Sequence, residues 1–361
     1  MLLDLLLPLH ERLPALNVFR YITFRTAGAV LTALAICLLA GPRFIALLRR
    51  LSVGQNIREA GPASHQVKAG TPTMGGLLIL VSLTGATLLW AQLRNPLVWL
   101  ALAVTLGFGA VGFADDLLKV RRHRNLGLGV RAKLGGQFLV AGGAGLALWI
   151  WPEHFGVPAS LTFPFFKGWV LPLGGWYVPF ALVVLVSTSN GVNLTDGLDG
   201  LAIGAMLIAA STYAVFTYVA GHAGLARYLQ VPYVAGVGEV AVFCGALAGA
   251  SLGFLWFNAH PAEVFMGDVG SLALGGAIGT VALLSRQEIV LILVGGLFVI
   301  EAVSVILQVA SFKATGRRIF RMAPLHHHFE LGGWAESKVI ARFWILSLVF
   351  ALLGLSTLKL R

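Results

Sequence analysis

Residues 95–116 read NPLVWLALAVTLGFGAVGFADD. The first twenty of these residues, 95–114, carry no charge, and Asp115 and Asp116 follow them directly. An α-helix needs about 20 predominantly apolar residues to cross a bilayer. Such runs recur along the whole chain of 361 residues, which is 58% hydrophobic and only 11% charged. Soluble domains usually carry about 25% charged residues. The composition therefore excludes a soluble enzyme and predicts one integral membrane domain over residues 1–361.

Stretches with almost no charge predict where the chain crosses the membrane. Their apolar runs are continuous, whereas strands of a membrane barrel alternate in polarity. We therefore expect an all-α polytopic membrane protein with about ten transmembrane helices. Ten crossings place both termini on the same side. The ten stretches are 26–42, 69–93, 95–114, 134–152, 168–195, 200–226, 240–262, 269–285, 289–312 and 343–358.

Basic residues predict the orientation of these helices. Most of the 26 lysines and arginines fall in or beside the loops after odd-numbered spans, and such loops are usually cytoplasmic. Both termini are then on the outer, periplasmic side. Five prolines between 152 and 179 predict an outer, non-helical hairpin there. The segments expected to form a cytoplasmic active site are 49–71, 114–133, 187–199, 258–268 and 312–338.

Five of the six aspartates fall on this predicted cytoplasmic side. A charged side chain at a helix centre costs about 2.5–3.5 kcal/mol on insertion scales, so acids in such a chain indicate a function. Carboxylates facing a basic surface suit Mg²⁺, a hard cation that is often shared with substrate phosphates. The alternative is that the acids form salt bridges with neighbouring arginines. The five are Asp115, Asp116, Asp196, Asp199 and Asp268.

The spacing around these acids predicts shared faces. Lys119 lies three to four residues after the Asp115–Asp116 pair, on the same face of a helix. Asn193, Asp196 and Asp199 recur every third residue in NGVNLTDGLDGLA. In FMGDVGSLALGG, Asp268 opens a helix whose first N–H groups could take a phosphate.

Three consecutive histidines, His326, His327 and His328, precede the last span in MAPLHHHFE. Catalytic zinc needs three converging protein ligands, and successive residues diverge in a regular backbone. We therefore favour polar contacts with a nucleotide or phosphate over zinc.

Polar residues also recur at helical spacing along residues 301–311, and this stripe must face protein or a cleft. If it lines the site, Gln308 at its cytoplasmic end would contact the substrate. Packing within the protein is the alternative.

Together, GTPTMGG, DDLLK, NLTDGLDGLA, FMGDVGSLALGG and MAPLHHHFE resemble the phospho-N-acetylmuramoyl-pentapeptide transferases of bacteria, the MraY family. The aspartate motifs resemble the wider superfamily of polyprenyl-phosphate N-acetylhexosamine-1-phosphate transferases, and the histidine loop resembles the muramoyl branch. The resemblance covers nearly the whole chain in order. It implies a multi-pass enzyme of the bacterial inner membrane that acts in peptidoglycan synthesis, and hence in cell-wall biogenesis, cell shape and cell division.

The implied reaction transfers phospho-MurNAc-pentapeptide from UDP-MurNAc-pentapeptide to undecaprenyl phosphate, giving lipid I and UMP with Mg²⁺. The resemblance implies that Asp268 is the metal ligand, that Asp115 and Asp116 serve the lipid phosphate and the metal, and that Lys119 holds phosphate. It also implies a substrate-binding set with Phe265 stacking on uracil and Lys68 at the rim. That set is Lys68, Asn193, Asp196, Asp199, Asn258, Phe265, His327 and His328, to which the sequence patterns add His326 and Gln308.

The chemistry leaves little for a general base to do. A phosphomonoester has a second pKa of about 6, so the lipid phosphate is already mostly dianionic at neutral pH. We therefore expect Asp115 or Asp116 to act through orientation and metal electrostatics. A two-step route through an aspartyl-phosphate is the alternative mechanism.

Two other functions remain open at the level of sequence. A related enzyme could transfer GlcNAc-1-phosphate to a polyprenyl phosphate, and a membrane transporter could also use intramembrane acids. Transporter sites usually lie near the bilayer midplane, unlike these aspartates. Expected partners are the two substrates, membrane lipids and a second copy of the chain in a homodimer, but not nucleic acid.

Overall fold

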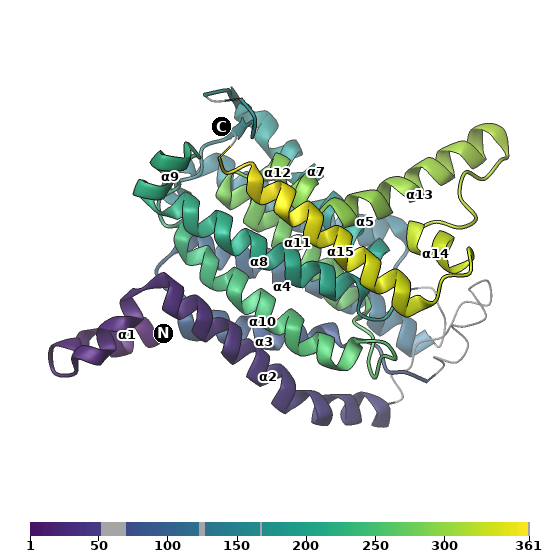
Figure 1. The fold of residues 1–361 in the computed structure, drawn as a ribbon, viewed down its shortest axis with the longest axis horizontal. Coiled ribbons are helices and arrows are strands. Elements are labelled where there is room, and N and C mark those ends of the chain that lie inside the picture. Colours follow the sequence, from purple (N-terminus) through teal and green to yellow (C-terminus); the bar gives the residue numbers. More distant parts are fainter. Residues whose placement is uncertain (52–69, 123–126, 167, 360–361) are drawn as a thin grey trace.

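The computed structural model describes residues 1–51, 70–122, 127–166 and 168–359. It is an all-α bundle with one small hairpin (Figure 1). Nine helical segments of the described chain are long and apolar enough to cross a membrane: α2 (Ile22–Arg50), α4 (Pro96–Arg122), α5 (Val130–Ile150), Gly174–Thr195 with α7 (Tyr177–Thr195), α8 (Leu201–Gly221), Val237–Asn258 with α10 (Val240–Asn258), α11 (Gly267–Ser285), α13 (Gly296–Thr315) and α15 (Glu336–Ser356).

The predicted fold class is confirmed, and each of the ten predicted stretches contains a membrane helix or a shorter apolar one. The helix in stretch 69–93 is the shorter one: α3 (Gly76–Trp90) has only 15 residues. At 1.5 Å per residue it spans about 22 Å, less than the hydrocarbon core. Residues 71–75 precede it as non-helical backbone with Met74 at a φ of 70°. The prediction placed helix ends at charges, but α2, α4 and α15 continue through charged residues.

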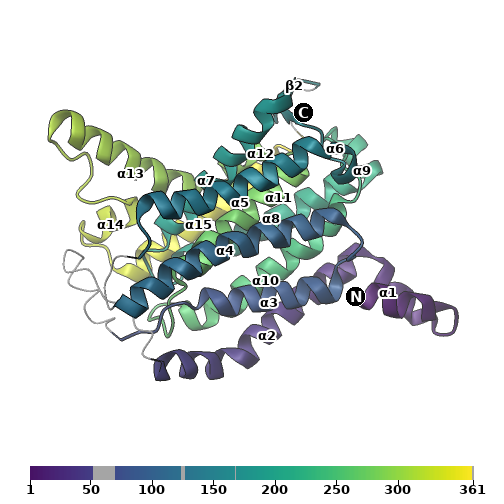
Figure 2. The same cartoon turned by 180° about the vertical axis from the view of Figure 1, so that it is seen from behind.

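Helix α11 lies in the middle of the bundle in both views (Figure 1; Figure 2). It packs against α3, α4, α7, α8 and α12 (Glu288–Val294), and every residue from Val269 to Ser285 is buried. Glycines permit these close contacts. A Cβ on Gly76 would collide with the backbone of Gly270, and a Cβ on Gly112 would collide with the backbone carbonyl of Asp268.

The predicted hairpin between 152 and 179 is present as two short antiparallel strands, with Leu161 opposite Leu171. A short helix precedes them, so the segment is not wholly non-helical as predicted. The short elements of the chain are α1 (Leu2–Leu6), η1 (Leu7–Glu11), η2 (Pro14–Arg20), α6 (Pro152–Phe155), β1 (Ser160–Thr162), β2 (Val170–Pro172), η4 (Gly174–Trp176), α9 (Ala223–Leu229), η5 (Val237–Glu239) and α14 (Leu325–Glu330).

A buried ion pair ties the start of α2 to η5. Arg25 donates to both carboxylate oxygens of Glu239, at 2.6 Å from Nη1 and 2.5 Å from Nη2. The backbone N–H of Gln92, just beyond α3, donates to the same carboxylate at 3.0 Å. Removing one partner of a buried pair leaves the other charge uncompensated. These hydrogen bonds therefore join α2, η5 and the segment after α3 to one another.

We expect Glu239→Gln to lower the free energy of unfolding by about 3 kcal/mol, because Arg25 would keep its buried charge without a counter-charge. Thermal denaturation of the detergent-solubilised protein measures the change. Glu153→Gln is the control, because Glu153 is an exposed acid. Equal melting temperatures for Glu239→Gln and the wild type would contradict the assignment.

Candidate functional site

Three carboxylates meet at one end of the bundle. Asp115 and Asp116 lie near the end of α4, and Asp268 lies in the first turn of α11. One carboxylate oxygen from each lies within 4.8 Å of the others. Asp115 and Asp116 are each only 3% exposed. The structure thus brings together the three acids that the sequence nominated for metal and catalysis.

Backbone groups fix the orientation of the adjacent pair. The N–H of Leu128 donates to Asp115 Oδ1 at 2.6 Å, and the N–H of Val269 donates to Asp116 Oδ2 at 3.0 Å. Gly267, at a φ of 72°, leaves room beside Asp116 that a Cβ would fill. Each carboxylate therefore keeps one oxygen directed toward the shared cluster.

Two ammonium groups bind the same carboxylates. Lys119 Nζ lies 2.7 Å from Asp115 Oδ2, 3.2 Å from Asp116 Oδ1 and 2.7 Å from Asp268 Oδ2. Lys133 Nζ lies 2.8 Å from Asp268 Oδ2. Among the residues that the structure describes, these three acids therefore form salt bridges with lysines and not with the arginines that the alternative interpretation named.

Lys133 is a site residue that the sequence analysis did not single out. It lies in the first turn of α5, which packs against α4. The signal available in the sequence was its position at the start of a helix that follows the Asp115–Asp116 helix after a short connection. Antiparallel neighbours joined in this way place their adjoining ends together.

Asn193 supports Asp268 from a third helix. Its Nδ2 donates to Asp268 Oδ1 at 2.6 Å and to Ser271 Oγ at 2.7 Å. Asn193 lies in the last turn of α7, which also packs along α11. The predicted site residue Asn193 is therefore in contact with the carboxylate cluster.

Asp196 follows α7 and lies near the same cluster. Burial, followed by the negative charges of Asp268, Asp116 and Asp199, raises the pKa of Asp196 to about 8. A carboxylate in such surroundings is stabilised by a cation. A cation bound at the cluster would therefore favour the charged form of Asp196.

Asp199 and Asn258 brace a second part of the site. Asp199 Oδ2 lies 3.1 Å from His260 Nδ1, and the backbone N–H of Asp199 donates to Glu336 Oε1 at 3.2 Å. Asn258 accepts from Gly200 N at 3.1 Å and donates to the carbonyl of Val264 at 2.8 Å. These bonds connect the loop after α7 to the segment before α11.

Phe265 lies on that segment and is half-buried. Its carbonyl accepts from Gly75 N at 2.9 Å, and its own N–H donates to the carbonyl of Pro72 at 2.8 Å. The TPTMGG motif is thus paired with the FMGD motif. Lys68 lies outside the described residues.

The three histidines have different hydrogen-bonding or charged partners. His326 is fully buried with its Nδ1 3.3 Å from Glu301, while His327 Nδ1 lies 2.7 Å from Glu330. His328 Nδ1 accepts from the backbone N–H of Arg321 at 3.1 Å. The two clusters of potential metal ligands found in the described part of the chain include none of these histidines.

His326 nevertheless adjoins the aspartate loop, because a Cβ on Gly197 would collide with its Nε2. Gln308, at the far part of α13, uses its side chain to hold the backbone of the histidine loop. Its Oε1 accepts from Ile319 N and Phe320 N at 3.0 and 2.9 Å, and its Nε2 donates to Phe320 O at 3.0 Å. These contacts favour the packing alternative for Gln308.

The donor set fits a hard divalent cation. Mg²⁺ takes oxygen ligands, usually one or two carboxylates together with substrate phosphates. Asp115, Asp116 and Asp268 supply such oxygens within a small volume. Two ammonium groups do not fully balance these three carboxylates. The cluster is therefore suited to a metal and to anionic phosphates together.

The raised pKa of Asp196 predicts how Asp196→Asn changes stability. An acid whose pKa is higher in the folded than in the unfolded state loses its stabilising contribution as the pH rises between the two values. The unfolded value is about 4 and the folded value about 8. In metal-free buffer, the melting temperature of Asp196→Asn minus that of the wild type should grow from about pH 5 to about pH 8 and then stay constant. The exposed Glu263→Gln is the control, and a difference that does not vary with pH would refute the prediction.

The chain is also similar to known proteins in sequence. Residues 98–286 match the family model described as glycosyl transferase family 4, and residues 68–80 match signature 1 of the phospho-N-acetylmuramoyl-pentapeptide-transferases. The chain is similar over its full length, and that of each relative, to three proteins with this name. They are 60% identical in Solidesulfovibrio magneticus, 59% in Nitratidesulfovibrio vulgaris and 55% in Pelobacter propionicus. Identity at this level over the whole chain shows that it belongs to the phospho-N-acetylmuramoyl-pentapeptide-transferase family.

Proposed function

We propose that this protein transfers phospho-MurNAc-pentapeptide from UDP-MurNAc-pentapeptide to undecaprenyl phosphate, forming lipid I and UMP with the help of Mg²⁺. The observation that carries the proposal is the cluster of Asp115, Asp116 and Asp268 with Lys119 and Lys133 at one end of membrane-spanning helices. Such a cluster can bind phosphates from water and from lipid at the same membrane face.

We also propose that this end faces the cytoplasm of a bacterial inner membrane, with both termini on the periplasmic side. The helix ends beside the cluster are basic, as cytoplasmic ends usually are. Segments 49–71, 114–133, 187–199, 258–268 and 312–338 then form the active-site loops of a single domain. The basic residues that support this orientation include Arg49, Arg50, Arg121, Arg122 and Lys313.

Asp268 is the proposed metal ligand, with Asp115 and Asp116 completing the oxygen donors. When bound, Mg²⁺ would neutralise phosphate charge that the protein alone cannot balance. Lys119 and Lys133 lie in contact with the same carboxylates and can donate to phosphate oxygens. Asn193 holds Asp268 in place.

Nucleotide recognition is proposed for the adjoining loops. Asp196, Asp199 and Phe265 lie beside the cluster, and Phe265 offers its ring for stacking on uracil. Asn258 holds this region together from within. We assign His327 and His328 to the pocket and Lys68 to its rim, while His326 and Gln308 support the loop that carries the two histidines.

The reaction makes one diphosphate and breaks another. A lipid phosphate oxygen forms a new P–O bond to the sugar-bearing phosphorus, and the P–O bond to UMP breaks. Because the attacking phosphate is already mostly dianionic at neutral pH, the residues need mainly to position it and offset repulsion between anions. The fixed backbone contacts of Asp115 and Asp116 suit this role.

We expect Asp115→Asn to lower kcat by at least about 100-fold, since an electrostatic contact made in the transition state is lost. The rate should not recover at high pH, because proton removal is not the main role of Asp115. The pH–rate profile of UMP release measures this, with Asp4→Asn as control on an acid outside the cluster. Recovery to the wild-type rate at high pH would make Asp115 a general base instead.

Release of UMP by the purified protein tests the function itself. We expect turnover with UDP-MurNAc-pentapeptide and a polyprenyl phosphate, dependent on Mg²⁺ and lost on chelation. Turnover with UDP-GlcNAc alone would instead support the GlcNAc-1-phosphate alternative, and trapping of a labelled covalent enzyme would establish the two-step route. Substrate flux without turnover would point to a transporter.

A further inference from the structure

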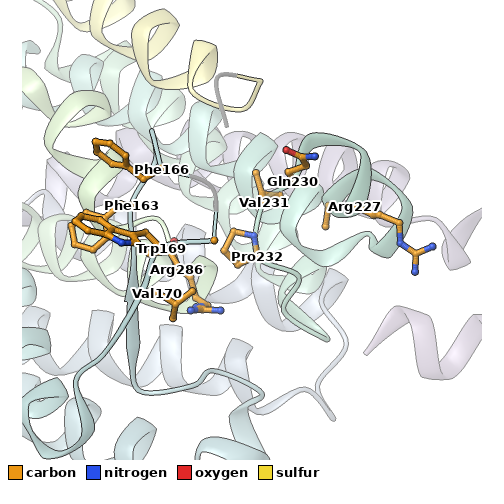
Figure 3. A pocket seen from close by; sticks show the side chains of 12 residues that line it. Phe163, Phe166, Trp169, Val170, Arg227, Gln230, Val231, Pro232 and Arg286 are labelled. Carbon is orange, nitrogen blue, oxygen red and sulfur yellow. Dashed lines mark hydrogen bonds between the residues drawn. The ribbon is translucent and has the colours of Figure 1, made fainter.

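A cavity of about 340 Å³ lies at the other end of the bundle from the aspartates. Helix α11 starts at the aspartate cluster and ends at Ser285, so its 19 residues separate the two places by about 28 Å. The β1–β2 hairpin forms one wall of the cavity, and the segment after α9 forms the other (Figure 3). The volume falls in the range of small-molecule sites, about 300–1,000 Å³.

Arg286 supplies a buried cation to this cavity. It caps α11 at a φ of 56° and is 9% exposed. Its Nη2 donates to Ser160 Oγ at 2.8 Å, while its Nε is buried without a hydrogen-bond partner. A guanidinium has five N–H donors, and one bond to a neutral hydroxyl does not balance its charge. An anion bound in the cavity would balance the charge of Arg286.

The acid nearest to Arg286 in the chain, Glu288, interacts with it through its charge but accepts no hydrogen bond from it. Glu288 is buried two residues further on, and both of its carboxylate oxygens lack a hydrogen-bond partner. Burial raises the pKa of Glu288 to about 8, so it is a weaker counter-charge to Arg286 than an ordinary carboxylate would be. Arg227 also lines the cavity, but its guanidinium points away from the other labelled side chains (Figure 3). Among the described residues that line the cavity, Arg286 is therefore the buried cation that an occupant would meet.

Exposed aromatic rings form the rim. Phe166 is 60% exposed and Trp169 is 65% exposed, and both belong to the hairpin side of the cavity (Figure 3). Aromatic rings at the ends of membrane helices occupy the headgroup region of a bilayer. An occupant that meets Arg286 below and these rings at the mouth needs a phosphate and an apolar part.

We propose that this cavity binds the phosphate of an anionic lipid headgroup from the leaflet opposite to the aspartate cluster. Arg286 donates to the phosphate, and Phe166 and Trp169 contact the apolar part of the lipid. A free phosphate shares the first contact but not the second. The site is separate from the proposed transfer reaction and does not depend on it.

Binding of phosphatidylglycerol to the detergent-purified full chain, measured by native mass spectrometry, tests the proposal. We expect Arg286→Gln to weaken binding at least about 10-fold, since a charge-assisted hydrogen bond is lost. Arg227→Gln should bind within about 2-fold of the wild type, because that guanidinium points away from the cavity. Arg286→Lys should retain most of the affinity. Wild-type binding by folded Arg286→Gln would overturn the proposal.

A second variant covers the case in which Arg286→Gln fails to fold, since Arg286 also holds the hairpin through Ser160. Trp169→Ala changes an exposed ring, so it should fold and bind phosphatidylglycerol several-fold more weakly. Unchanged binding by Trp169→Ala would overturn the proposal. Inorganic phosphate should compete only weakly with the lipid, and equally strong competition would show a free-phosphate site instead.

Discussion

The close approach of α4 and α11 is the constraint on which the site depends. Gly112 has no side chain, so the first turn of α11 lies directly against α4, with the carbonyl of Asp268 where a Cβ would otherwise be. The N–H of Val269 then reaches Asp116. Were these helices separated by one larger side chain, the carboxylates from the two helices would no longer share a cluster. Helix packing, more than any loop, therefore creates the geometry of the acids.

This arrangement gives a site that combines carboxylates, which suit a cation, with ammonium groups, which suit phosphate. Three carboxylates meet two ammonium groups in surroundings that are partly removed from water, where electrostatic interactions are stronger than in bulk solvent. Neither set is satisfied if the other is removed. A reaction between two phosphates, both negatively charged, needs such a balance more than it needs proton transfer.

Much of the fold followed from composition, because long uncharged runs have few alternatives to membrane helices. The meeting of Asp115, Asp116 and Asp268 also followed, since helices that alternate in direction bring such ends to one face. Lys133 did not, because its reach to Asp268 depends on how α5 packs against α4. The role of Gln308 in holding a loop could not be predicted either, because the backbone groups that it binds leave no pattern in the sequence. The short α3 was missed since charges alone do not mark where a non-helical segment ends.

Helix α11 is hidden from lipid along its length, with every residue from Val269 to Ser285 buried. Bilayers of different thickness act on the helices they touch, by tilting them or by deforming around them. The helix that carries Asp268 has no such contact, so its neighbours absorb the mismatch first. The position of Asp268 is consequently less sensitive to the thickness of the surrounding bilayer than it would be on a helix that faces lipid.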